Sequence, residues 1–384
     1  MNSFSKRRYF DWAATAPPDS PVSGERPGGH PFGNPSSRYL EGRKARAALE
    51  DARNRCAAVL GVQAEQLFFT SGGTESNALL LFSPLLRGRG DILYSAVEHP
   101  SVSENCRVLE RLGKRRATIA VEGDGRVSVK TLEAALEKNP EARLAAIMGV
   151  NNETGAIMDL VGLVGQIRKR EGAPMHVHCD MVQGVGKIPL DLTTLDVDSA
   201  SVSAHKLGGP RGIGLLYCRK ELEPLYRGGG QEGGMRPGTE NTAGILALAD
   251  CLEKRLRPDT LATAYTAASG RWNTLIRALR NLGRCFLIPR DREEGDPRFS
   301  PYILQAAFGD IPGEVMVRAL DDAGFAVSTG SACSSGQDKR PILAAMGVDA
   351  KTALRGIRIS QGWTTTGEDV DALINAIGEI LKTL

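Results

Sequence analysis

The sequence predicts an α/β protein built on a mostly parallel sheet, and three observations lead to this fold class. Short apolar runs of strand length alternate with longer stretches of helical periodicity. Polar side chains follow several apolar runs directly, as they do where ligands bind beyond the carboxyl ends of parallel strands. The 384 residues exceed one ordinary core, so we expect a large α/β domain and a smaller second domain.

The individual elements follow from the local patterns. Residues 41–61 have helical spacing and end at a glycine, which is typical of a helix C-terminus. The segments that begin with a strand-like run are 65–82 (strand, glycine turn, helix), 91–102, 142–155, 174–187 and 197–218 (two strands around a glycine turn). Residues 256–298 are charged and helical, and we assign them to the smaller domain together with the C-terminus and the first few residues.

Composition excludes several classes of protein. The net charge of +3 comes from 48 basic and 45 acidic side chains, a balance that does not favour direct nucleic-acid or membrane-surface binding. No apolar stretch reaches the roughly 18 residues of a membrane span, and the first residues lack a signal-peptide pattern, so we expect a cytoplasmic protein. The seven cysteines include no C-x-x-C pair, which argues against a disulfide framework or a zinc knuckle.

Five polar clusters follow apolar runs and are expected to meet at one edge of the sheet: Ser71–Thr74, Glu98–His99, Asn151–Thr154, Asp180–Gln183 and His205–Lys206. The glycine turn at 71–74 suits a phosphate at a helix start, although an ordinary N-cap has the same appearance. Asp180 at a strand end needs a partner, which a protonated pyridine nitrogen or a salt bridge could supply. Lys206 at a strand end is either a surface amine or a desolvated amine able to form a Schiff base. A Schiff-base lysine, a ring-nitrogen aspartate and a phosphate site together are what pyridoxal 5′-phosphate requires.

The chain resembles the cysteine desulfurases, the NifS/IscS-like branch of the fold-type-I pyridoxal-phosphate enzymes in the class-V aminotransferase family. The motifs that carry the resemblance span about residues 9–370 and occur in the family's order: "YFDWAATAPP", "FGNPSSRYLEGRKAR", "FFTSGGTESNALLL", "AVEHPSV", "NNETGAI", "HVHCDMVQGVGKIPLDL", "SVSAHKLGGPRGIGLLYCR", "GGGQEGGMRPGTEN" and "STGSACSSG". The resemblance implies a large domain at 15–255 with a mostly parallel seven-stranded sheet. It also implies a smaller α+β domain, formed by 1–14 and 256–384, that carries the catalytic cysteine loop.

The resemblance also implies roles for single residues. Lys206 would form the Schiff base, and Asp180 would pair with the ring nitrogen. His99 would stack on the ring and shuttle protons. The other implied cofactor contacts are Gln183 and Asn152 near the ring hydroxyl, Gly73, Thr74, Ser203 and His205 at the phosphate, and Thr239 at the phosphate of the neighbouring subunit, which makes a homodimer the expected assembly.

For the substrate, the resemblance implies that Asn34 and Arg358 bind the carboxylate, with Arg355 as the alternative arginine. Cys333 lies among small and polar residues, so it is expected on a flexible loop as the nucleophile. The implied reaction converts L-cysteine to L-alanine and leaves a persulfide on Cys333. The sulfur would then go to an acceptor protein for iron–sulfur cluster assembly, transfer-RNA thiolation or DNA phosphorothioation.

Three residues depart from the family pattern: Met181, Gln361 and Trp363. Other readings also remain open. A selenocysteine lyase, an aminotransferase or a kynureninase-like enzyme would share Lys206 and Asp180, although the last two need no loop thiol. The alternation of His176, His178 and Asp180 could bind zinc or iron, although two ordinary strand histidines are expected more often. A non-enzymatic scaffold for sulfur-trafficking proteins is a further alternative.

Overall fold

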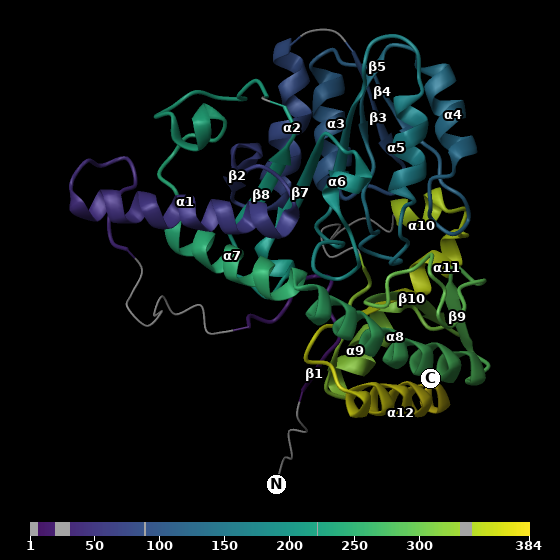
Figure 1. The fold of residues 1–384 in the computed structure, drawn as a ribbon. Helices are drawn as coiled ribbons and strands as arrows, with labels where there is room; N and C mark the ends of the chain where they lie inside the picture. Colours follow the sequence, from purple (N-terminus) through teal and green to yellow (C-terminus); the bar gives the residue numbers. More distant parts are fainter. Residues whose placement is uncertain (1–6, 20–30, 88–89, 221, 331–339) are drawn as a thin grey trace.

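The molecule is built around a seven-stranded sheet with the strand order β2-β8-β7-β6-β5-β3-β4, seen in the ribbon of a computed structural model (Figure 1). The structure describes residues 7–19, 31–87, 90–220, 222–330 and 340–384. The strands of this sheet are β2 (Leu67–Thr70), β3 (Asp91–Ser95), β4 (Arg116–Ile119), β5 (Ala142–Ala146), β6 (His176–Asp180), β7 (Ser199–Ser203) and β8 (Gly214–Cys218).

Strand direction confirms the mostly parallel sheet predicted from the sequence. The pairs β3–β4, β3–β5, β5–β6 and β6–β7 are parallel, whereas β8 runs antiparallel to both β7 and β2. The carboxyl ends of β3, β5, β6 and β7 therefore lie at one edge of the sheet. β7 and β8 are the two strands that the pattern of residues 197–218 predicts around a glycine turn.

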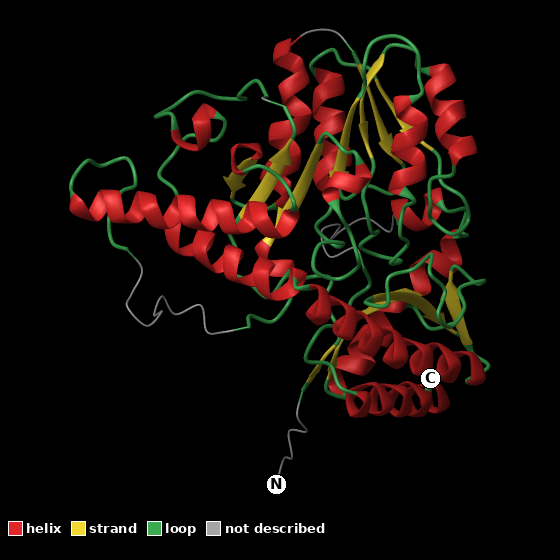
Figure 2. Ribbon diagram, in the orientation of Figure 1, coloured by secondary structure: helices red, strands yellow, loops and turns green. Residues whose placement is uncertain are grey.

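Helices cover both faces of this sheet (Figure 2). One face packs an apolar cluster of Leu80, Leu81, Val102 and Leu109 from α2 and α3. The opposite face packs a larger cluster that includes side chains of α1, α4, α5, α6 and α7. The bounds of these helices are α1 (Leu40–Leu60), α2 (Gly73–Arg87), α3 (Pro100–Arg111), α4 (Val129–Lys138), α5 (Leu160–Arg168), α6 (Leu192–Leu195) and α7 (Thr242–Leu256).

Local sequence explains where these helices begin and end. The helix predicted at 41–61 is α1, and it ends at Gly61 in the left-handed conformation that glycine adopts most easily. α3 begins after His99, whose side chain accepts from Ser101 N, with Pro100 in the first turn. α4 begins with a capping box between Ser128 and Thr131.

Most of the remaining described residues form two small sheets with their own helices. One sheet is antiparallel, with the strand order β12-β10-β9. In the other, β1 pairs in parallel with β11. Trp272, Phe308 and Ile357 belong to an apolar cluster of this part. Its elements are β1 (Arg8–Tyr9), α8 (Pro258–Asn281), β9 (Cys285–Ile288), β10 (Ile303–Phe308), α9 (Gly313–Asp322), β11 (Phe325–Ala326), α10 (Pro341–Ala345), α11 (Ala350–Arg355), β12 (Gly356–Ser360) and α12 (Gly367–Thr383).

Three short 3₁₀ turns complete the described part of the chain, and one of them matters for the site. They are η1 (Ala64–Gln66), η2 (Ala204–Lys206) and η3 (Gln231–Gly234). η2 directly follows β7, so Lys206 is held by a turn at the carboxyl end of a buried strand. Among the described residues, no helix is both long and apolar enough to cross a membrane.

Candidate active site

Lys206 lies at the junction between the large sheet and the N-terminal segment. Its Nζ donates to the carbonyl oxygens of Ala13 at 2.5 Å and Ala14 at 2.6 Å. The side chain is half-buried. Gly208, two residues on, has φ +86, a conformation that lets the chain turn sharply after η2. The lysine is therefore a held amine at the strand edge and not a freely solvated one.

Asp180 ends β6 and is 5% exposed. Its Oδ1 accepts from the backbone N–H of Val182 at 3.0 Å, and its Oδ2 accepts from Asn77 Nδ2 at 2.8 Å. Asn77 lies on α2, one helical turn after Gly73, so the helix that begins at the glycine turn also supports the aspartate. Asn77 is not among the residues singled out from the sequence. Its spacing of four residues from Gly73, which is about one helical turn, could have placed it near the site.

His99 is connected to Asp180 through two intermediate side chains. Asn77 Nδ2 also donates to Ser101 Oγ at 2.7 Å, and Ser101 Oγ lies 2.8 Å from His99 Nδ1. The backbone N–H of Ser101 donates to the same Nδ1 at 3.1 Å. A backbone N–H can only donate, so Nδ1 carries no proton and the neutral ring is protonated at Nε2. Burial lowers the pKa of His99; Asp180 opposes this shift, whereas Lys206 and Arg358 add to it.

The histidines of β6 are part of the same hydrogen-bond network. His178 Nε2 lies 2.9 Å from Asn77 Oδ1, and its Nδ1 lies 2.9 Å from Ser199 Oγ, which also contacts His176 Nε2 at 2.8 Å. Burial lowers the pKa of His178 to about 3 and that of His176 to about 4, so both rings are neutral. Both nitrogens of His178 are occupied by protein partners. Within the described ranges no group of three metal-ligating side chains occurs.

The turn between β2 and α2 forms a cradle of open backbone. Gly72 has φ +152, and a Cβ at Gly73 would lie 2.7 Å from a Val182 methyl group, so both positions favour glycine. Among the described residues, the N–H groups of Gly73 and Thr74 have no acceptor. Ser203 borders this turn, with its Oγ 3.7 Å from a Cβ built at Gly72. The start of a 15-residue helix with free N–H groups suits a phosphate.

His205 and Gln183 flank Lys206. His205 Nδ1 lies 3.2 Å from Thr15 Oγ1, and burial, with Lys206, lowers the pKa of His205 to about 4. Gln183 is 3% exposed, and its Nε2 donates to Ala13 O at 2.8 Å. The carbonyl oxygen of Ala13 thus accepts from both Gln183 and Lys206.

The loop after β5 brings Asn152 to the same region. The side chain of Asn151 organises this loop, because its Oδ1 accepts from Glu153 N and Thr154 N, both at 2.9 Å. Asn152 Oδ1 is buried and has no hydrogen-bond partner among the described residues. A buried acceptor without a donor is costly, so this atom is suited to a bound group that carries a donor.

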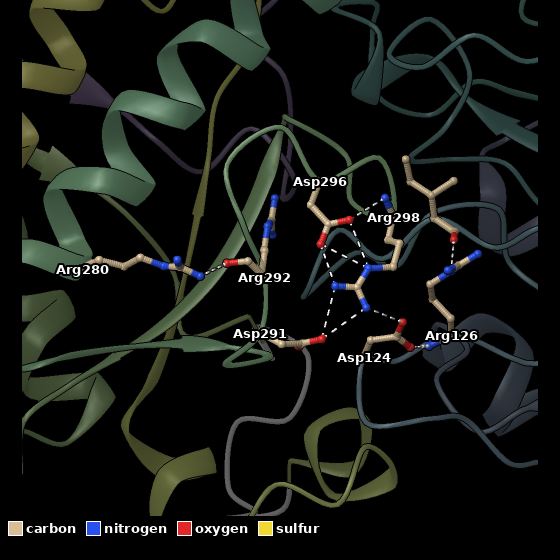
Figure 3. A network of polar contacts seen from close by, with 8 residues as sticks. Asp124, Arg126, Arg280, Asp291, Arg292, Asp296 and Arg298 are labelled. Carbon is tan, nitrogen blue, oxygen red and sulfur yellow. Dashed lines mark hydrogen bonds and ion pairs between the residues drawn. The ribbon is translucent and has the colours of Figure 1, made fainter.

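A segment of the smaller part supports this loop from outside. The guanidinium of buried Arg292 donates to the carbonyl oxygens of Thr154 at 2.9 Å, Ile303 at 2.8 Å and Ser300 at 3.0 Å. Next to it, Arg298 makes ion pairs with three carboxylates that converge on its guanidinium (Figure 3). These carboxylates belong to Asp124, Asp291 and Asp296. The loop that carries Asn152 is therefore held by a hydrogen bond from Arg292, which is far away in the sequence.

The two candidate arginines for a substrate carboxylate have different surroundings. Arg358 on β12 is 3% exposed; its Nη1 donates to Asn152 O at 2.9 Å and its Nη2 contacts Asp11 Oδ1 at 2.8 Å. Its Nε has no partner among the described residues. Arg355 instead pairs with Asp310, whose side chain is 85% exposed. Only Arg358 is thus joined to the loop that carries Asn152.

Three predicted residues are not brought to this cluster by any contact that the structure describes. Asn34 is exposed before α1, and its Oδ1 accepts from Ser36 N at 2.9 Å. Thr239 is exposed in the loop before α7, where it lines a cavity of about 110 Å³ with Thr70 and Gly212. Cys333 lies outside the described residues. The segments flanking it are held near β12, since Arg340 donates to the carbonyl oxygens of Thr329 and Gly356.

Of the residues that depart from the family pattern, Met181 and Gln361 are buried and Trp363 is partly buried. The Met181 sulfur lies 3.2 Å from Cys179 Sγ. Gln361 Nε2 donates to Ala268 O at 2.8 Å and Pro301 O at 2.7 Å. Trp363 packs edge-on against Trp12 and lies under the guanidinium of Arg255, which is 3.6 Å from its ring centroid. Trp363 therefore packs between α7 and the N-terminal segment, whereas Gln361 binds within the smaller part.

Comparisons with known proteins agree with this arrangement. The sequence model of the aminotransferase class-V family matches residues 8–373. The chain is 38% identical to a cysteine desulfurase of Cereibacter sphaeroides over 92% of this chain and 89% of that one. It is 35% identical to the cysteine desulfurase IscS of Salmonella arizonae over 98% and 93% of the two chains. A solved NifS-like protein superimposes with a TM-score of 0.88, at 34% identity, over 98% of this chain and 100% of the other. The chain therefore belongs to the aminotransferase class-V family, in its cysteine desulfurase branch.

Proposed function

We propose that this chain takes sulfur from L-cysteine at the carboxyl edge of its large sheet, with pyridoxal 5′-phosphate held by Lys206, Asp180 and the Gly73–Thr74 turn. Cysteine desulfurases of the class-V aminotransferase family are pyridoxal-phosphate enzymes, and this chain is one of them. The observation that carries the residue assignment is the convergence of a held amine, a buried carboxylate and free helix-start N–H groups. These are the three groups that the aldehyde, the pyridine nitrogen and the phosphate require.

Each protein group has a defined task in this proposal. Bound pyridoxal phosphate supplies an electron sink that stabilises negative charge at the Cα of an amino acid. The Asp180 carboxylate keeps a proton on the pyridine nitrogen. Lys206 Nζ would hold the aldehyde and, once free, would be the base that accepts the proton from Cα. His99 presents its Nε2–H toward the site, and the orphaned Asn152 Oδ1 accepts from the bound group.

Cys333 completes the reaction as the sulfur acceptor on the enzyme. Its thiolate attacks the substrate sulfur, an S–S bond forms, and the substrate Cβ–S bond breaks with its electron pair left on carbon. Protonation of that carbon and return of a proton to Cα give L-alanine, and the enzyme keeps a persulfide, so that atoms and electrons balance without an added oxidant. Burial argues against most other thiols as nucleophile, because it raises the pKa of Cys56, Cys106 and Cys285 to about 12 and that of Cys251 to about 11.

Arg358 is the proposed partner of the substrate carboxylate. Its position beside Asn152 and its unpartnered Nε support this role, whereas Arg355 pairs with Asp310. Asn34 would need to approach from elsewhere, since no described hydrogen bond joins it to Arg358. A partner subunit is the natural source of Asn34.

We further infer a homodimer in which Thr239 reaches the cofactor phosphate of the partner. α1 and the turn before it extend beyond the sheet (Figure 1), and this region exposes Phe32, Tyr39 and Leu40. An exposed apolar group on a projecting arm is suited to burial against a second copy. We propose in addition that residues 1–14 and 256–384 form the smaller domain. The proposed location is the cytoplasm, and the proposed recipient of the persulfide sulfur is an acceptor protein.

The first experiment compares the natural protein with Cys333→Ala and with Cys285→Ala as a matched control. Each is given L-cysteine and a reductant, and alanine and sulfide are measured. We expect the natural protein and Cys285→Ala to form both products. Cys333→Ala should bind the cofactor and form neither. Equal activity in all three proteins would remove Cys333 from the mechanism, and a preference for selenocysteine would favour the lyase reading.

A further inference from the structure

Lys187 is a second lysine buried beside the reaction site. It is 3% exposed and lies in the turn that follows β6, four residues after Gln183. Gly186 before it has φ +69, and a Cβ there would lie 2.8 Å from a Leu207 methyl carbon. The glycine thus allows the Lys187 turn to pack directly against the segment of Lys206.

A short hydrogen-bond chain joins the two lysines. Lys187 Nζ donates to Gln183 Oε1 at 2.7 Å, and Gln183 Nε2 donates to Ala13 O at 2.8 Å. Lys206 Nζ donates to that same carbonyl oxygen at 2.5 Å. Within the described ranges, no carboxylate forms an ion pair with Lys187. A buried amine without a counter-ion is costly, and this makes a purely structural reason for it weak.

The polarity of this chain determines the orientation of the Gln183 amide. A lysine amine next to an amide binds its oxygen, and a backbone carbonyl can only accept, so Gln183 must present Oε1 to Lys187 and Nε2 to Ala13. The second N–H of Nε2 is then left to donate toward the site. Without Lys187, the contact with Ala13 O alone would be left to hold the amide in this orientation.

We propose that Lys187 is a positioning residue of the desulfurase site, which holds the Gln183 amide with its second N–H toward the cofactor ring oxygen and places a titratable amine next to Lys206. This inference rests on the proposed function of Lys206 and Gln183. It adds a residue that touches neither cofactor nor substrate, but acts on two groups that do.

Electrostatics support the second half of this role. Burial lowers the pKa of Lys187 to about 7, and Lys206 and Arg358 contribute to the shift. His205 also lies within the reach of its charge. The charged and titratable groups acting on Lys187 are thus Lys206 and His205 of η2 and Arg358 of β12. Because coupling between two amines is reciprocal, a proton on Lys187 disfavours a proton on Lys206.

The test uses the cofactor-loaded enzyme and reads the absorption of the cofactor bound to Lys206 as a function of pH. Lys187→Met removes the amine and keeps a chain of similar length, and Lys169→Met changes an exposed lysine as the control. We expect Lys187→Met to raise the apparent pKa of the Lys206 linkage by about one unit, as expected from the loss of one nearby like charge. Lys169→Met should titrate like the natural protein.

A second pair of variants tests the amide orientation without measuring turnover. Gln183→Glu loses both N–H groups of the amide, so cofactor affinity should fall, although Lys187 can still pair with the new carboxylate. In Gln183→Glu with Lys187→Met, the carboxylate is buried without a partner, and cofactor affinity should fall at least tenfold below the product of the two single effects. Circular dichroism of the apo proteins checks folding, and if Lys187→Met does not fold, Lys187→Gln takes its place.

The outcomes separate this inference from the proposed function. An unchanged titration in Lys187→Met, with additive effects in the double variant, would overturn the role of Lys187 even if cysteine turnover by the natural protein stands. A loss of stability without a spectral shift would also overturn it. If Cys333→Ala still releases alanine and sulfide, the role of Cys333 as sulfur acceptor fails, while a spectral shift at Lys206 would still support the Lys187 inference.

Discussion

Asn77 and Asp180 are joined by a hydrogen bond of 2.8 Å between the side-chain amide on α2 and the carboxylate at the end of β6. The same amide donates to Ser101, and its oxygen lies 2.9 Å from His178 Nε2. All four side chains are buried. Asn77 is therefore the centre of the network that holds the proposed ring-nitrogen partner and, through Ser101, the proposed stacking histidine.

Replacing Asn77 by leucine should weaken cofactor binding. The change leaves Asp180 Oδ2 and His178 Nε2 without the Asn77 partner, which costs about 1–3 kcal/mol per unpaired group. We expect the cofactor dissociation constant to rise by roughly 10- to 100-fold, a range that follows from that energy. Absorbance titration of apo protein with pyridoxal phosphate measures it. Asn139→Leu, at the end of α4, serves as control, and an equal effect of both changes would contradict the prediction.

His99 should act as an Nε2–H donor, because Ser101 N donates to its Nδ1. Glutamine can present an N–H in place of Nε2–H, so His99→Gln should keep more alanine formation than His99→Ala. The pKa of His99 is lowered by burial, so the ring stays neutral through pH 7 and takes up a proton only as the pH falls below its ordinary value of 6.5. Titration of His99 should therefore cause no loss in the rate of alanine formation by the natural protein between pH 7 and pH 8. Equal activity of the two variants would argue against the donor role.

Glu98 should make stability depend on pH. Its Oε1 accepts from Ser95 Oγ at 2.6 Å and Met148 N at 2.7 Å, while burial, opposed by the Ser95 hydrogen bond, raises its pKa to about 8. The unfolded state loses this proton near pH 4.5, so folding must take it up between pH 4.5 and 8, and stability falls as pH rises through that window. The difference amounts to a few kcal/mol over the window.

The Glu98→Gln variant tests this dependence, since glutamine does not titrate. Relative to the natural protein, it should become progressively more stable from pH 5 to pH 8. Urea unfolding at pH 5, 6.5 and 8 measures the difference. A stability difference that stays constant across these three values would show that Glu98 does not carry the raised pKa.

Arg292 should be far more important for stability than Arg298, although both lie in one network (Figure 3). Arg292→Met removes the donor from three buried carbonyl oxygens, and we expect a loss of on the order of 3 kcal/mol in the free energy of unfolding. Arg298→Met removes partly exposed ion pairs and should cost about 1 kcal/mol or less. Thermal unfolding of both variants makes the comparison. A larger loss in Arg298→Met would reverse this assignment.

The sequence by itself determined the order of elements and the strand-end location of the site. The spacing of apolar residues and the identity of turn residues are local properties of a sequence. The helix ending at Gly61 and the strand pair around Gly208 were therefore predictable from their own segments. The parallel direction of β3, β5, β6 and β7 then requires Asn152, Asp180 and Lys206 to share one edge.

Only the tertiary structure decided which side chains act on one another across that edge. Asn77 is 103 positions from Asp180 and Arg358 is 347 from Asp11, and such contacts depend on how helices and loops pack, which no local pattern encodes. The pairing of Arg355 with Asp310, and of Lys187 with Gln183, follows from side-chain directions that are set by that packing. Hydrogen-bond polarity, which assigns the proton of His99 to Nε2, likewise requires the positions of donors and acceptors in space.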